Sequence, residues 1–180
     1  VMGPTHVPFA FACGLGYGVA VGMPAVQAFA VGVLATATSA GRLSPDVDQR
    51  PGWRRTDKAV PDEALGAGGP MQHRGVTHWW FWPALAWWSL GEVPTGVVGW
   101  IPQALVIGWV SHLLGDFLFG KDRGIPLGPW FWHVGLGLDT DGALERWLVR
   151  PVVLPAAVAV LGLAAVGQLG AVFEMVRRAA

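Results

Sequence analysis

The sequence has few charged residues, a single cysteine and no basic patch with interleaved aromatic residues. Only 13% of its 180 residues are charged and the formal net charge is zero, whereas a soluble domain has about 25% charged residues. No global field would recruit nucleic acid, so we exclude nucleic-acid binding. The single cysteine, Cys13, excludes an internal disulfide. The N-terminal stretch lacks the basic region of a secretory signal, so we expect its first apolar segment to be retained.

Apolar residues dominate the chain. They make up 53% of it, with 11 tryptophans, which is too much for a buried core alone, so we expect the surplus to face lipid and the tryptophans to lie near the headgroups. A buried soluble helical domain is the minor alternative. We predict an all-α fold: an integral membrane helical bundle, formed by a single domain over residues 1–180. Its four to five apolar segments lie at about 7–21, 25–41, 76–90, 97–119 and 151–173, and its polar loops at 42–74 and 120–150.

The first charge-free stretch is interrupted at Gly22-Met23-Pro24, where a helix is expected to break or kink. Each half would span only about 23–26 Å, so a thinned bilayer or a re-entrant hairpin is conceivable. Gly14 and Gly18 recur with Gly22 at every fourth position, a spacing that favours close packing of helices in lipid.

The basic residues indicate the orientation. All 12 Lys and Arg residues fall in the two polar loops or at the extreme C-terminus, and positive loops favour the cytoplasm. If residues 7–41 form a hairpin, His6 returns to the side of Asp46 and His78, and we expect a metal site at the cytoplasmic face. The last segment would then carry Arg177 and Arg178 outward, against the same rule.

His112 and Asp116 are the first candidate metal ligands. Their spacing of four residues on a predicted helix places both side chains on one face, close enough to chelate one ion. Such a pair is more often a simple hydrogen-bonded couple. Near the end of a lipid-embedded helix, however, an uncompensated carboxylate costs a few kcal/mol, which favours a bound cation.

Two further groups lie at the mouths of apolar segments. His73 and His78 flank Arg74, whose planar fork suits an oxyanion, although such histidines can also simply extend to water at the interface. Asp46 and Asp48 alternate after Pro45, so in an extended stretch both carboxylates would face one site. A solvated turn is the alternative for this pair.

These blocks occur in an order that resembles the YdjM-like family, inner-membrane proteins under LexA control that are described as metal-dependent hydrolases. The LexA link concerns the gene and implies no LexA partner. The resemblance rests on short motifs running from residue 5 to about residue 148. They are Thr5-His6, Leu43-Ser44-Pro45-Asp46-Val47-Asp48, His73-Arg74-Gly75-Val76-Thr77-His78, Gly108-Trp109-Val110-Ser111-His112-Leu113-Leu114-Gly115-Asp116, Gly124-Ile125-Pro126-Leu127 and Leu144-Glu145-Arg146-Trp147.

The resemblance implies a bacterial inner-membrane location and a divalent cation, for which we expect Zn²⁺. More distantly, the His-xxx-Asp helix with an upstream His and Asp is similar to the zinc site of the phospholipase C and P1 nuclease group. Glu145 would belong to the family's late acidic motif. The metal residues that the resemblance implies are His6, Asp46, Asp48, His73, His78, His112 and Asp116.

The preferred hypothesis is a hydrolase in which a cation-bound water supplies the nucleophile. Asp48, His73 or Glu145 could accept a proton, and Arg74 could hold an oxyanion. A phosphoester is then the most natural substrate and a lipid phosphate the most accessible one, with membrane lipids as partners. The alternatives are a structural metal site in a non-enzymatic protein and, ranked below it, an ion or proton path. The sequence leaves the oligomeric state open.

Overall fold

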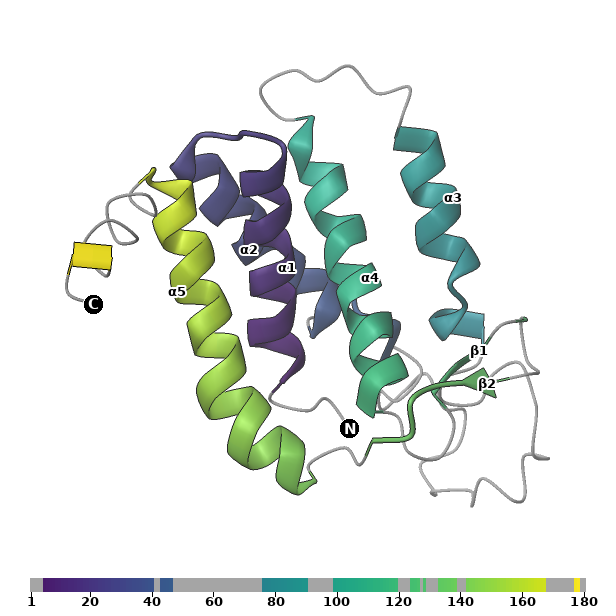
Figure 1. The fold of residues 1–180 in the computed structure, drawn as a ribbon. Coiled ribbons are helices and arrows are strands. Elements are labelled where there is room, and N and C mark those ends of the chain that lie inside the picture. The colour runs from purple at the N-terminus through teal and green to yellow at the C-terminus, as the bar shows by residue number, and fades with distance from the viewer. Residues whose placement is uncertain are drawn as a thin grey trace.

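A computed structural model describes residues 5–40, 43–46, 76–90, 99–119, 124–126, 128, 133–138, 142–167 and 177–178. Within these ranges the chain is mainly helical, which confirms the predicted all-α class (Figure 1). Four predicted apolar segments correspond to helices, with the third preceded by a short turn, Val76–His78. These helices are α1 (His6–Ala20), α2 (Ala25–Ser39), α3 (Phe81–Leu90) and α4 (Trp100–Phe119).

Helices α1 and α2 form the predicted hairpin, and small residues let them approach closely. A Cβ atom added at Gly14 would lie 2.8 Å from the Cα of Gly32, and one at Gly18 would lie 2.6 Å from the Cα of Ala28. Gly22 does not have the packing role that its spacing from Gly14 and Gly18 predicts. It has a φ of 73° in the turn between the helices, with no atom near its missing Cβ, so it permits the turn rather than the packing.

Helix α4 packs against α2 through another close approach. A Cβ at Gly108 would collide with the carbonyl oxygen of Ala35. The hydroxyl of Thr38 donates a hydrogen bond of 2.6 Å to the carbonyl oxygen of Leu105, joining the two helices again. This contact fixes the last turn of α2 beside the middle of α4, and it therefore sets the position of the residues that follow each of them.

The last helix begins earlier than the predicted segment at 151–173. It runs from Glu145 through a π-helical stretch, Glu145–Val153, into α5, Leu154–Ala165. Pro151 lies inside the π-helical stretch, where the wider turn accommodates a residue that lacks an N–H and that would break a regular α-helix. The helix therefore brings Glu145 and Arg150, which the sequence assigned to a polar loop, into ordered structure.

Within the part of the chain that the structure describes, two helices are long and apolar enough to cross a membrane, α4 and the continuous helix Glu145–Ala165. Only 6% of the most apolar window of Glu145–Ala165 is buried, against 44% for α4. Exposed large apolar side chains continue over α3, at Trp82, Trp87 and Trp88. This distribution is the one expected of a bundle whose outer helices face lipid.

The chain topology gathers the polar residues at one end of the bundle. Figure 1 shows that α1, α3 and the last helix begin at the end where α2 and α4 finish. A two-residue antiparallel ladder lies at the same end, with β1 (Ile125–Pro126) paired to β2 (His133–Val134). Residues far apart in sequence can therefore meet there, as the predicted hairpin required.

Candidate metal site

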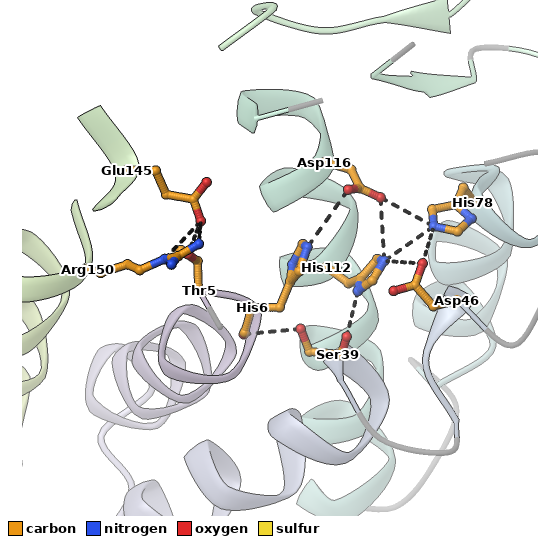
Figure 2. Close-up of polar contacts among 9 residues, drawn as sticks. All are labelled: Thr5, His6, Ser39, Asp46, His78, His112, Asp116, Glu145 and Arg150. Atoms are coloured by element: carbon orange, nitrogen blue, oxygen red, sulfur yellow. Dashed lines mark hydrogen bonds and ion pairs between the residues drawn. The ribbon is translucent and has the colours of Figure 1, made fainter. Parts of the chain in front are cut away.

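Five predicted metal residues converge at this end of the bundle, and all are buried (Figure 2). Each comes from a different segment except for the pair on α4. We call the following residues the His/Asp cluster: His6 at the start of α1, Asp46 in the turn after α2, His78 in the turn before α3, and His112 with Asp116 on α4.

The sequence explains how these turns hold their side chains. The chain bends at Ser44 and forms a short helical turn at Pro45 and Asp46, where the carboxylate of Asp46 lies 3.6 Å from the Nε2 of His112 on α4. The turn with His78 is tied to α3 because the indole N–H of Trp82 donates a hydrogen bond of 2.8 Å to the carbonyl oxygen of Val76. A Cβ at Gly115 would lie 2.7 Å from the ring of His6, so glycine lets that imidazole lie against α4.

The Nε2 atoms of His78 and His112 lie between the carboxylates of Asp46 and Asp116, and we call these four residues the Asp46 side. The Nε2 atoms of His78 and His112 lie 3.3 Å apart. The Nε2 of His78 lies 3.4 Å from Oδ1 of Asp46 and 3.3 Å from Oδ2 of Asp116. For the Nε2 of His112 these distances are 3.6 Å and 3.5 Å.

These separations can be compared with the size of a zinc site. A cation bonded tetrahedrally at 2.0–2.2 Å holds its ligand atoms about 3.3 to 3.6 Å apart. The five distances on the Asp46 side fall in this range, and Asp46, His78 and His112 together have the spacing required of a group that could bind one ion. The donor set, two imidazoles and two carboxylates, also suits zinc.

A second group shares two residues with the first, and we call it the His6 side. His6, His112 and Asp116 could also bind an ion. The Nε2 of His6 lies 3.8 Å from Oδ1 of Asp116, so the two oxygens of this carboxylate face different histidines. The ring of His6 stacks on that of His112 with centroids 4.4 Å apart.

The outer nitrogens of two histidines are oriented by neighbours. The Nδ1 of His112 lies 2.5 Å from the carbonyl oxygen of Ser39, which can only accept, so the proton lies on Nδ1 and Nε2 is the atom available to a cation. The Nδ1 of His78 lies 3.1 Å from the hydroxyl of Thr77, which can orient that ring in the same way. Such outer partners are typical of metal-binding histidines.

The electrostatics favour an ionised Asp46. Burial opposes the charged form of its carboxyl, but the hydrogen bonds and charges of His112 and His78 outweigh burial and hold its pKa below the usual range. The carboxylate is therefore an anionic ligand at neutral pH. A divalent cation could compensate it as the imidazoles do.

A second polar group lies on the His6 side, away from Asp46 (Figure 2). The hydroxyl of Thr5 hydrogen-bonds to Oε1 of Glu145. The guanidinium of Arg150 donates to the same carboxylate oxygen at 2.9 Å and to the hydroxyl of Thr5 at 2.7 Å. Glu145 is 1% exposed, and no metal group among the described residues includes it. Arg150 thus pairs the carboxylate that was predicted as a proton acceptor.

Three predicted site residues, Asp48, His73 and Arg74, lie outside the described residues. Sequence reasoning missed Ser39, Thr77 and Arg150 as parts of the site. Ser39 contacts His112 through its backbone carbonyl, an interaction that no side-chain pattern in the sequence indicates. Thr77 directly precedes a candidate ligand, and Arg150 follows Glu145 by five residues, so position alone could have drawn attention to these two.

The fold and the cluster define a helical membrane protein with buried His/Asp groups that could hold a metal ion. The comparison with protein families agrees with this class. The family model described as YdjM inner membrane protein matches residues 1–173, and the chain belongs to that family. No curated protein and no solved structure matches the chain. The distant similarity to the phospholipase C and P1 nuclease group stays a prediction.

Proposed function

We propose that this protein is a membrane-bound, metal-dependent hydrolase that cleaves a phosphoester, with lipid phosphates as its substrates and Zn²⁺ as its cation. The observation that carries the proposal is the set of donor distances on the Asp46 side, 3.3 to 3.6 Å. Imidazole and carboxylate groups buried in a membrane protein are costly unless they are compensated. Here they converge at the spacing that a small cation requires.

His78, His112, Asp46 and Asp116 would hold the first cation. Four protein ligands are also typical of a purely structural zinc site, which is the alternative. The observation that favours catalysis is the His6 side, where the Nε2 of His6 and the second oxygen of Asp116 extend the donor set beyond those four. These two groups also line a cavity, so they face space that a substrate could occupy.

When bound, a divalent cation of this kind lowers the pKa of a water molecule toward about 7 and polarises a phosphoryl oxygen. The imidazole of His6 would then orient the substrate phosphate at the cavity, and Asp116 would help to hold the cation that attracts the phosphate. Glu145 could accept a proton, with Arg150 and Thr5 fixing its carboxylate. Asp48 and His73 are further proton acceptors and Arg74 a further oxyanion ligand in this proposal, and we place the site at the cytoplasmic face on the positive-inside rule.

Elemental analysis of the full chain, purified in detergent, tests cation binding. We expect bound zinc in the unmodified protein and background levels in His112→Ala, because the Nε2 of His112 belongs to both groups. His133→Ala is the matched control, since His133 is exposed in β2. A metal-free unmodified protein, or equal metal content in His112→Ala, would contradict the proposal.

Phosphate release from phosphatidic acid in mixed micelles tests the reaction. We expect release that chelation stops and zinc restores, that His6→Ala abolishes, and that His133→Ala leaves intact. A structural site gives a different pattern: bound zinc whose removal lowers thermal stability, and no phosphate release from any preparation. That pattern would support the structural alternative and contradict hydrolysis.

A further inference from the structure

A cavity of about 230 Å³ opens beside the His6 side of the cluster, between α1, α4 and the last helix. Its walls are mainly apolar and include Phe9, Leu118, Val149 and Leu154. Val153, which is 47% exposed, lines it as well, so the cavity reaches the surface of the last helix. In a membrane protein, that surface faces the hydrocarbon of the bilayer.

The other end of the cavity is polar. His6, Asp116, Glu145 and Thr5 all line it, and Arg150 binds Glu145 and Thr5 from behind. The cavity is thus amphipathic along its length, with possible cation ligands at one end and the lipid-facing surface of the last helix at the other. A soluble phosphoester has no hydrocarbon chain that could contact the apolar walls of the cavity.

We propose that this cavity binds one hydrocarbon chain of a phosphate-bearing amphiphile, with the phosphate at the His6 and Asp116 end. The proposal rests on the proposed function and names the part of the substrate that the protein selects. An apolar cavity of about 150 Å³ already binds a benzene-sized ligand, so this larger cavity has room for part of one chain. Arg150 already pairs with Glu145, so the positive charge that attracts the anionic head would be that of a cation held by His6 and Asp116.

The test uses the full-length protein in detergent and a single-chain alkyl phosphate with a photoactivatable diazirine in its chain. After irradiation, peptide mass spectrometry locates the label. We expect it on segments lining the cavity, in α1, at the end of α4 and around Val149. An unlabelled alkyl phosphate of the same length should compete with the labelling.

Two substitutions fill the cavity and one is a matched control. Val149→Phe should lower the apparent affinity for the probe about tenfold, the factor expected when roughly two methylene groups lose their apolar contacts. Val153→Phe at the exposed mouth should act in the same direction with less risk to folding. Val152→Phe should have no effect, because Val152 is 53% exposed and does not line the cavity.

Labelling that is not competed, that spreads over the outer face of the last helix, or that is equal in Val149→Phe, Val153→Phe and Val152→Phe would overturn the inference. If Val149→Phe or Val153→Phe fails to fold, competition by the unlabelled alkyl phosphate in the unmodified protein tests the inference. The measurement needs no turnover. Competed labelling in the cavity without hydrolysis supports the chain site and rejects the hydrolase, whereas hydrolysis with uncompeted labelling rejects the chain site alone.

Discussion

The Asp46 side and the His6 side, which share His112 and Asp116, differ in how many donor groups lie around a possible cation position. On the Asp46 side, the Nε2 atoms of His78 and His112 lie 3.3 Å apart, and each lies 3.3 to 3.6 Å from an oxygen of Asp46 and of Asp116. On the His6 side, a single additional imidazole lies 3.8 Å from the second oxygen of Asp116, and a cavity begins there. The first arrangement could hold an ion, and the second leaves room for a ligand.

The two sides are also supported differently. On the Asp46 side, the outer nitrogens of the imidazoles face the carbonyl of Ser39 and the hydroxyl of Thr77. On the His6 side, the imidazole is positioned by stacking on His112, by the absence of a side chain at Gly115, and by the Ser39 hydroxyl, which donates to the His6 carbonyl at 3.3 Å. Ser39 therefore contacts a histidine on each side, and the following substitutions test whether the two sides can be changed separately.

The largest effect is expected from Asp116→Asn, because this carboxylate contributes one oxygen to each side. The amide keeps the shape but loses the charge, so we expect cation content and phosphate release both to fall to background. Elemental analysis and the micelle assay measure these. If Asp116→Asn kept its full zinc content, Asp116 would not be a ligand shared by the two sides, and the comparison between them would fail.

Gly115→Ala should affect the His6 side alone. The added Cβ would lie 2.7 Å from the His6 ring and displace it. A displacement of about 1 Å at a reacting centre can lower a rate about 100-fold, so we expect phosphate release to fall by that factor while the cation on the Asp46 side remains. Gly162→Ala is the control, because nothing lies within 4 Å of its Cβ position. Loss of zinc in Gly115→Ala would show that the two sides are not separable.

Thr77→Val should weaken the Asp46 side in a graded way. It removes the hydroxyl beside Nδ1 of His78 while keeping the shape of the side chain. Loss of such an outer partner typically lowers metal affinity about 10- to 100-fold, which competition with a chelator of known affinity measures. Thr36→Val is the matched control, since the Thr36 hydroxyl donates a hydrogen bond to the carbonyl of Val33 within its own helix. Equal affinities in the two variants would mean that Thr77 does not orient His78.

Much of the fold could be predicted because it follows from local pattern. Charge-free stretches broken at Pro24 gave the hairpin of α1 and α2, and the spacing of Gly14 and Gly18 gave its packing. The start of the last helix could not be predicted in this way. Pro151 indicates a helix boundary by its local chemistry, and only the π-helical turn, which the sequence does not encode simply, carries the helix through it.

The residues that meet in the cluster could be predicted where their meeting follows from helix spacing and chain direction. His112 and Asp116 share a face by helical periodicity, and His6 reaches them because the hairpin of α1 and α2 returns the chain to the end at which α1 begins (Figure 1). The roles of these residues as ligands stay predictions. The pairing of Glu145 with Arg150 and Thr5 depends on contacts across about 140 residues of sequence and on an irregular helix, so periodicity offered no way to anticipate it.

The smallest effect on cation binding is expected from Thr5→Val. The Thr5 hydroxyl links Glu145 and Arg150 to the start of α1, next to His6 but outside both metal groups. Its loss removes hydrogen bonds to charged groups, each contributing about 1.5 to 3 kcal/mol, so the midpoint of thermal unfolding in detergent should fall while zinc content stays unchanged. The isosteric Thr36→Val, at an exposed hydroxyl of α2, should leave both unchanged. If Thr5→Val instead lost zinc, the His6 side would have to include Glu145 and its partners as part of the cation site.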